Sequence, residues 1–317
     1  MVQYRTFHNR DPKRFLKLWH NSGLGPSAAE GFPCDILEYF VFSLPFFDPK
    51  GFFLATEGEE VLGICHASFP PVEDESRLDN TQGCISALMV HPDFRRQGIG
   101  RELVQRAEAY LAAAGATSIQ LGAGLDRNGF YNGIYGGLQS SGFNVSSGPW
   151  HEFAESLGYA PATRTQILHR DLSSGRDPVS SRLIRHRRRL NLVITDRASE
   201  MSWWWHARFG QLDSLQFELR QRHDEDLVAS GQIVGLDVFV PKWGIRAVGI
   251  QQVIVPEESR RHGYGLSLVL EICRRLREQS IQLIEAQVDE ANPAALELFQ
   301  TAGFECVELL STWQRSL

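Results

Sequence analysis

The sequence is poor in the residues that mark metal-binding and disulfide-rich proteins. It has only five cysteines and three methionines, and no two cysteines form a C-x-x-C pair. This pattern indicates neither a zinc site nor a disulfide framework, so no metal is expected. The scattered cysteines are expected to be reduced and buried: Cys34, Cys65, Cys84, Cys273 and Cys306.

Long apolar runs are also missing. No run approaches the ~20 residues that a membrane-spanning helix needs. The best one, Y-F-V-F-S-L-P-F-F at 39–47, is short and interrupted by Pro45. The first residues, M-V-Q-Y-R-T-F-H-N-R-D, lack the apolar core of a signal peptide. We therefore expect a cytoplasmic protein with no membrane partner.

An excess of positive charge is absent as well. Lysine and arginine number 32 against 38 aspartates and glutamates, for a net charge of -6. Such a balance does not favour attraction of the whole protein to nucleic acid or to an anionic membrane. An apolar fraction of 43% is typical of a globular protein, and 317 residues suffice for one large domain or two ordinary ones.

What the sequence does contain is the same basic, glycine-rich turn twice. R-R-Q-G-I-G occupies 95–100 and R-R-H-G-Y-G occupies 260–265, an offset of 165 residues. A strand-like run precedes each turn, and a helical pattern and a second strand-like run follow it. Each copy is thus predicted to form strand–turn–helix–strand, a crossover that implies parallel pairing of its two strands.

The repeat predicts two α/β domains. The Ser-, Gly- and Pro-rich stretch at 171–181 marks the break between them. We expect a first domain at 1–172, a linker at 173–182 and a second domain at 183–317. The first half carries roughly 20 extra residues, mostly within 127–144, and a loop of that length either lines a substrate pocket or makes a neutral surface excursion.

Glycines that open a helix predict an anion site. The first backbone N–H groups of a helix are unpaired, its dipole favours negative charge, and flanking arginines add charge-assisted hydrogen bonds. A P-loop is excluded because Arg101, not lysine, follows Gly100. A Rossmann fingerprint is excluded because Leu103 stands where its third glycine would be. A third nucleotide-type ligand to consider is coenzyme A.

The two turns with their flanks, V-H-P-D-F-R-R-Q-G-I-G and V-P-E-E-S-R-R-H-G-Y-G, resemble motif A of the GNAT superfamily of N-acetyltransferases. N-P-A-A-L-E-L-F-Q-T-A-G-F at 292–304 resembles its motif B. The resemblance covers roughly 40–170 and 190–315. It implies a tandem of two GNAT-like domains, each a mixed, mostly antiparallel sheet with a splayed parallel strand pair flanked by helices. It also implies direct transfer of an acetyl group from acetyl-CoA, or another acyl-CoA, to a primary amine.

The same resemblance assigns binding residues in both halves. In the family, pantetheine pairs with the strand before the turn, and the turn holds the pyrophosphate. Carried over, the first site comprises Leu88, Met89 and Val90 with Arg95, Arg96, Gln97, Gly98, Ile99, Gly100 and Arg101. The second comprises Val253, Ile254 and Val255 with Arg260, Arg261, His262, Gly263, Tyr264, Gly265 and Leu266.

The family's usual catalytic groups are absent from both halves. Its strand glutamate is replaced by Ser86 and Gln251, and its motif B tyrosine by Ala154 and Phe299. The substitutes in the first half are Tyr131 and Tyr135 as acids and His66 as base, since imidazole titrates near neutral pH. Each of the three also fits a purely packing role.

We expect an enzyme whose N-terminal domain acts on a small-molecule amine. The second half then binds CoA without chemistry or only braces the first. The missing acid and base leave an alternative, a non-catalytic acyl-CoA-binding or scaffold protein. Both a monomer and a homodimer fit, because the tandem could itself supply the domain pairing.

Two further stretches have open roles. The basic run R-L-I-R-H-R-R-R at 182–189 either binds nucleic acid or forms an exposed helix or strand whose arginines pair with acidic surface. The triplet W-W-W at 203–205 either packs in a core or domain interface or forms a platform on which a ligand stacks.

Overall fold

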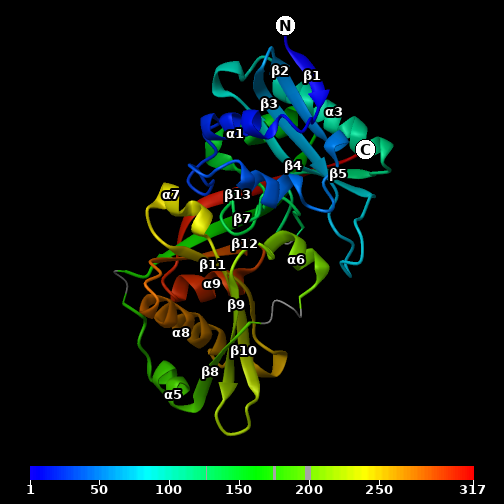
Figure 1. Ribbon diagram of the computed structural model, residues 1–317. Helices are drawn as coiled ribbons and strands as arrows, with labels where there is room; N and C mark the ends of the chain where they lie inside the picture. Colours follow the sequence, from blue (N-terminus) through cyan, green and yellow to red (C-terminus); the bar gives the residue numbers. More distant parts are fainter. Residues whose placement is uncertain (126, 174–175, 197–200) are drawn as a thin grey trace. The chain divides into compact units, whose positions relative to one another are not determined.

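The computed structural model describes residues 1–125, 127–173, 176–196 and 201–317 (Figure 1). Its contacts divide the chain into an N-terminal unit, Met1–Thr165 with Leu309–Leu317, and a C-terminal unit, Gln166–Glu308. This division differs from the expected boundary at 173–182, of which residues 174–175 lie outside the described residues. The difference arises because two long strands, β7 (Ala160–Asp171) and β13 (Glu305–Ser316), each have residues in both units.

The sheet of the N-terminal unit begins with five strands in chain order. They are β1 (Gln3–Thr6), β2 (Phe52–Glu57), β3 (Glu60–Ser68), β4 (Gln82–Val90) and β5 (Ser118–Leu121). Pairing is antiparallel up to β4, and β4 and β5 are parallel, as the crossover predicts. Strands β2 and β3 form a hairpin, in which Glu57 pairs with Glu60 across the turn.

The chain end completes this sheet. Trp313–Ser316 of β13 pair antiparallel with β5, and the short strand β6 (Phe143–Asn144) pairs with β13 at Leu310 and Ser311. The first part of β7 follows β13 in the strand order. A strand from the end of the sequence is therefore part of the N-terminal unit.

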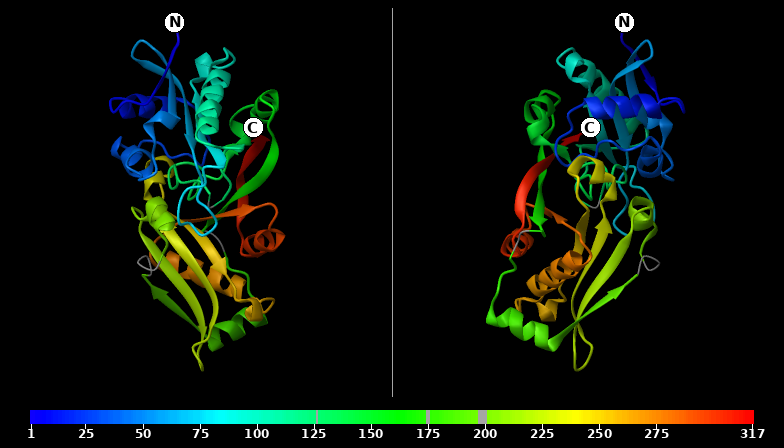
Figure 2. Two further views of the ribbon diagram at one scale, coloured as in Figure 1. Left: turned by 90° about the vertical axis from the view of Figure 1, so that its right-hand side faces the viewer. Right: turned by 60° about the vertical axis from the view of Figure 1, so that its left-hand side comes forward.

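Helices cover both faces of this sheet. The helix α1 (Pro12–Asn21) lies on one face and α3 (Ile99–Ala113) on the other (Figure 2). Side chains of a strand alternate between faces, so Phe52 packs against Phe15 of α1 while Phe53 packs against Tyr110 of α3. The shorter helices are α2 (Asp35–Leu37), a π-helical turn (Glu38–Phe42) and α4 (Trp150–Ser156).

The extra loop at 127–144 is buried. Phe130, Tyr131 and Ile134 are at most 1% exposed. The loop packs on the segment after α1, where the N–H of Tyr131 donates to the carbonyl of Phe40 at 3.2 Å. The surface-excursion alternative for this loop is therefore wrong.

The C-terminal unit repeats the plan. Its strands run β8 (Leu190–Thr195), β9 (Ser214–Gln221), β10 (Leu227–Gly235), β11 (Ala247–Ile254) and β12 (Leu283–Asp289), and the end of β7 follows β12. Only β11 and β12 pair in parallel among the five. The helices are α5 (Ser181–Arg189), α6 (Trp203–Phe209), α7 (Val240–Trp243), α8 (Tyr264–Glu278) and α9 (Pro293–Thr301). Each unit thus has the predicted mixed, mostly antiparallel sheet flanked by helices.

The tryptophan triplet forms the start of α6. Trp204 and Trp205 are 1% and 5% exposed, whereas Trp203 is 40% exposed. The indole N–H of Trp205 donates to Oε1 of Gln232 on β10 at 3.0 Å. For Trp204 and Trp205 the packing alternative is confirmed.

The cysteines are all free thiols, but they are not all buried. Cys65, Cys84 and Cys273 are buried, Cys34 is half-buried and Cys306 is exposed on β13, which corrects the expectation for the last two. Within the described ranges, no helix is long and apolar enough to cross a membrane.

Candidate functional site

The two glycine-rich turns have nearly the same backbone. In the first, a 3₁₀ turn at Pro92–Phe94 leads to Arg96 (φ 62°) and Gly98 (φ 83°), after which α3 begins. In the second, a 3₁₀ turn at Glu257–Ser259 leads to Arg261 (φ 61°) and Gly263 (φ 82°), after which α8 begins. Glycine adopts positive φ without a steric penalty, which explains its presence at both helix starts.

The parallel strands separate before each turn. In the N-terminal unit, β4 and β5 pair only over Gln82–Ile85 and Ser118–Leu121. Beyond Ile85 none of the described strands pairs with this edge of β4, while β3 occupies the other edge as far as Val90. In the C-terminal unit, β11 and β12 likewise pair only as far as Ile250 and Ala286. The expected splay is therefore present in both units.

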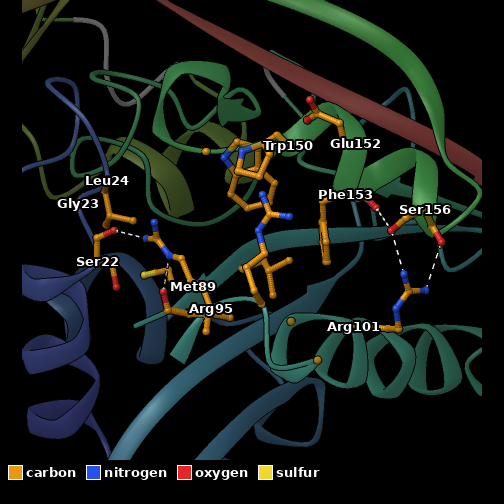
Figure 3. Close-up of a pocket in the computed structure, with 17 residues that line it drawn as sticks. Ser22, Gly23, Leu24, Met89, Arg95, Arg101, Trp150, Glu152, Phe153 and Ser156 are labelled. Atoms are coloured by element: carbon orange, nitrogen blue, oxygen red, sulfur yellow. Dashed lines mark hydrogen bonds between the residues drawn. The ribbon is translucent and has the colours of Figure 1, made fainter. Parts of the chain in front are cut away.

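A cavity of about 400 Å³ lies beside the separated part of β4 (Figure 3). The turn and the start of α3 bound it on one side, the end of α1 on another, and α4 with the residues before it on a third. Its lining comprises Ser22, Gly23, Leu24, Leu88, Met89, Val90, Arg95, Arg96, Gly98, Gly100, Arg101, Gly148, Pro149, Trp150, Glu152, Phe153 and Ser156.

The turn side of the cavity is open and positively charged. A Cβ added at Gly98 would meet no atom within 4 Å. Among the described residues, the structure records no hydrogen bond or ion pair for the guanidinium of Arg96. The guanidinium of Arg101 instead donates to the carbonyl and hydroxyl oxygens of Ser156, at 3.2 and 2.9 Å, and so ties α3 to α4. The unpaired N–H groups at the start of α3 can therefore receive an anion.

The other sides of the cavity are largely apolar. Met89 of β4, Leu24 after α1, and Trp150 and Phe153 of α4 contribute side chains to them. The Trp150 ring stacks on Phe143 with centroids 4.4 Å apart. Glu152 is the only carboxylate in the lining. It lies on α4 and is exposed to solvent.

The second turn is covered by α5. A Cβ added at Gly263 would lie 3.0 Å from Cδ of Arg182. Nδ1 of His186 lies 2.6 Å from the hydroxyl of Ser267, and its ring lies 4.9 Å from that of Tyr264. The side chains of α5 therefore occupy the space that is open at Gly98.

The basic run is thus a helix packed on α8. Arg187 pairs with Glu271 at 2.7 Å, as the surface-pairing alternative expects. The pKa of His186 is lowered by burial and by the nearby Arg182 and Arg185. Of the arginines of α5, Arg182 lies against the second turn.

Two of the expected catalytic residues, His66 and Tyr131, contact each other, but neither lines the cavity. Nδ1 of His66 lies 3.0 Å from the hydroxyl of Tyr131, and both residues are at most 1% exposed. Burial lowers the pKa of His66 to about 3 and raises that of Tyr131 well above its ordinary value. The third candidate, Tyr135, accepts a hydrogen bond from the N–H of Asn144 at 3.1 Å.

The positions of the family's base hold buried, hydrogen-bonded side chains. The hydroxyl of Ser86 lies 2.6 Å from that of Ser68 and donates to Oδ1 of Asn128 at 3.0 Å. In the second unit, Nε2 of Gln251 donates to Oε1 of Gln232 at 2.7 Å. Neither position supplies a titratable group.

Sequence reasoning missed two parts of the cavity lining. One is Ser22–Leu24, where α1 ends and Gly23 takes a φ of 61°. The other is Gly148–Ser156, which includes α4. The signal for α4 was the likeness of 155–159 to 300–304, which places a motif B helix in both halves.

Each unit thus has a glycine-rich turn at the start of a helix and a pair of parallel strands that separate before it, so the chain is a tandem of two similar units. The chain belongs to the acetyltransferase (GNAT) family: the profile of that family matches residues 23–132 and again 194–304, together over two thirds of the chain. Members of this family transfer acyl groups to amines.

A curated relative and several solved structures are similar to the chain. A mycothiol acetyltransferase of Geodermatophilus obscurus is 35% identical over 77 residues, so the chain spans about a quarter (24%) of that relative's length, and 24% of the chain itself is matched. A tandem GNAT protein from the clavulanic acid biosynthesis pathway superimposes with a TM-score of 0.68 at 17% identity, covering 100% of this chain and 98% of that one.

Two more solved structures show the same fold. A GCN5-related N-acetyltransferase from Sphaerobacter thermophilus has a TM-score of 0.66 at 14% identity, with 99% and 95% of the two chains covered. A glucosamine N-acetyltransferase region of a fungal β-N-acetylglucosaminidase has a TM-score of 0.71 at 15% identity, with 99% and 38% covered. At such identities the likeness concerns the fold alone.

Proposed function

We propose that the protein transfers an acetyl group from acetyl-CoA to the primary amine of a small molecule, and that the N-terminal unit carries the reaction. One observation supports this choice of unit. The turn at Gly98 opens onto a cavity beside an unpaired strand edge, whereas Arg182 and His186 cover the equivalent turn at Gly263. One coenzyme per chain is expected.

The residues present fit coenzyme A. The N–H groups at the start of α3, with the guanidinium of Arg96, would hold the pyrophosphate. The edge of β4 at Leu88 and Met89 would pair with pantetheine, while the carbonyl of Val90 already accepts a hydrogen bond from Arg95 at 3.0 Å. Bound acetyl-CoA supplies a thioester carbonyl for attack by the amine.

A side chain of the protein is needed to remove a proton from the substrate ammonium. An ammonium must lose a proton before its nitrogen can attack, and Glu152 is our candidate for the acceptor of that proton. We expect Glu152→Gln to lower kcat about 100-fold, in keeping with the usual contribution of a general base, while the Kd for acetyl-CoA stays within threefold. Steady-state kinetics and calorimetry of the same variant check this. An unchanged kcat would remove Glu152 from the mechanism.

The coenzyme site is tested by a matched pair of glycine variants. A glutamate at Gly98 would place a carboxylate where the pyrophosphate binds, so Gly98→Glu should weaken acetyl-CoA binding at least about 100-fold. Gly263→Glu should leave binding unchanged. Because alanine at positive φ carries the same backbone strain without the charge, Gly98→Ala is the control and should bind within about tenfold of the parent.

Calorimetric titration of acetyl-CoA into the four proteins gives both affinity and stoichiometry. One site per chain, lost only in Gly98→Glu, supports the proposal. Loss in Gly263→Glu, or two sites per chain, would assign coenzyme binding to the C-terminal unit as well. Binding without release of CoA over a panel of amines, glucosamine included, would instead favour a non-catalytic acyl-CoA-binding protein.

A further inference from the structure

The first arginine of the turn makes two contacts that belong to different parts of the cavity. Nε of Arg95 donates to the carbonyl of Val90, the last residue of β4, at 3.0 Å. Its Nη2 donates to the carbonyl of Ser22, where α1 ends, at 2.6 Å. Figure 3 shows the Arg95 side chain lying between these two segments. The guanidinium therefore joins the strand edge to the Ser22–Leu24 wall.

Comparison with the equivalent arginine of the second half distinguishes the two contacts of Arg95. Arg260, the equivalent of Arg95, donates from Nε to the carbonyl of Val255 at 3.3 Å. Both bonds span five residues, so this contact is part of the shared turn. Among the described residues, the structure records no second hydrogen bond for the guanidinium of Arg260. The bond to Ser22 is thus particular to the unit that has the open cavity.

The Ser22–Leu24 wall is fixed from both sides. Ser22 is 1% exposed, its N–H donates to the carbonyl of Trp19, and its hydroxyl donates to the carbonyl of Leu18 at 2.6 Å. On its other side the wall is held by Arg95. Gly23, with a φ of 61° and no atom within 4 Å of an added Cβ, lines the cavity next to it. Loss of the Arg95 bond would leave the buried carbonyl of Ser22 without this partner.

We propose that Arg95 is a positioning residue that fixes the Ser22–Leu24 wall for the amine substrate. The inference rests on the proposed function. The proposed coenzyme contacts lie on the N–H groups of α3, on Arg96 and on the edge of β4. The turn keeps its own backbone bond, from the N–H of Arg95 to the carbonyl of Pro92 at 3.2 Å, whatever the side chain is. Ser22–Leu24 line the same cavity but make none of these proposed coenzyme contacts. We therefore assign this wall to the acyl group and the amine that accepts it.

The test uses Arg95→Lys and Arg95→Gln, with Arg260→Lys as the matched control. Neither replacement has the forked guanidinium needed to reach both carbonyls. The backbone bond from residue 95 to the carbonyl of Pro92 does not depend on the side chain, so the turn should persist. We expect the KM for the amine to rise about tenfold in both Arg95 variants, because a charge-assisted hydrogen bond is lost. The Kd for acetyl-CoA should stay within threefold, and Arg260→Lys should match the parent in both.

Amide hydrogen exchange provides a second readout that needs no turnover. Peptides covering 18–25 should exchange faster in Arg95→Gln than in the parent or in Arg260→Lys. An unchanged amine KM overturns the proposal, and so does a parallel loss of coenzyme affinity, which would limit Arg95 to holding the turn. If the parent turns over no amine, the proposed function fails, and unchanged exchange at 18–25 then overturns the positioning role as well.

Discussion

His66 shows how burial decides what a titratable residue can do. Its ring lies among the aromatic side chains of Phe47, Phe52 and Phe130, the last with a centroid distance of 4.3 Å. Its Nδ1 lies 3.0 Å from the hydroxyl of Tyr131, and among the described residues its Nε2 has no hydrogen-bond partner. Because the charged imidazolium would be unsolvated there, the pKa falls to about 3 and the ring is neutral at pH 7.

This burial predicts a specific pH dependence of stability. The unfolded chain binds a proton on His66 below about pH 6.5, whereas the folded chain does so only near pH 3. The contribution of His66 to the free energy of unfolding is fully present above pH 6.5. It is lost as the pH falls toward 3, at up to about 1.4 kcal/mol per pH unit. Between pH 7 and pH 5 the free energy of unfolding should therefore drop about 2 kcal/mol more in the parent than in His66→Phe.

Urea unfolding at the two pH values measures both drops. Phenylalanine keeps an aromatic ring in the cluster but cannot titrate, and any cost of leaving the Tyr131 hydroxyl without its partner is the same at both pH values. Equal drops in the two proteins would mean that folding does not lower the pKa of His66.

Single residues were predictable from sequence where the backbone itself restricts the residue type. Gly98 and Gly263 occupy left-handed conformations at helix starts, and that requirement is visible in a local pattern. The partners of His66 and Arg95 were not predictable, since Tyr131 lies 65 positions away and Ser22 lies 73. Tertiary packing alone brings these groups together.

At the scale of elements, the strand–turn–helix units were predicted well. The helical pattern expected after the first turn matches α3, which ends at Ala113 with Ala114 as its cap. The second copy gives α8 with the same length of 15 residues. Local propensity and periodicity agree in these segments, and such agreement makes a sequence pattern reliable.

Two elements were ambiguous in the sequence because packing decides their roles. The glycine-rich loop at 127–144 is held by buried asparagines. Nδ2 of Asn128 donates to Ser140, and the N–H of Ser140 bonds to Oδ1 of Asn132 at 3.1 Å. The arginine-rich α5 turns Leu183 and His186 toward α8 and keeps most arginines in solvent. Neither arrangement follows from composition, and α5 is what distinguishes the two turns.

At the scale of the whole chain, each unit depends on a segment that the sequence repeat assigns to the other. The N-terminal unit needs residues 309–317, and the C-terminal unit includes 166–171. Trp313 is 2% exposed in the core that contains Leu103 and Leu111 of α3. Arg315 donates to the carbonyl of Leu157 at 2.8 Å and pairs with Glu108 at 3.1 Å. The repeat places the motifs correctly but cannot reveal this exchange of strands.

The exchange predicts that a fragment cut at the expected boundary is incomplete. Residues 1–172 keep the turn and the cavity lining but lack β13, the strand that pairs with β5. The fragment therefore exposes the edge of β5 and the part of the core against which Trp313 packs. We expect this fragment to show no cooperative urea unfolding and no acetyl-CoA binding. We expect a peptide of residues 305–317, added in trans, to restore both.

In the full chain, Trp313→Ala should lower the free energy of unfolding by about 3–5 kcal/mol. The same peptide with that substitution is the control and should restore neither property. A fragment 1–172 that unfolds cooperatively and binds the coenzyme alone would show that the final strand is dispensable to the N-terminal unit.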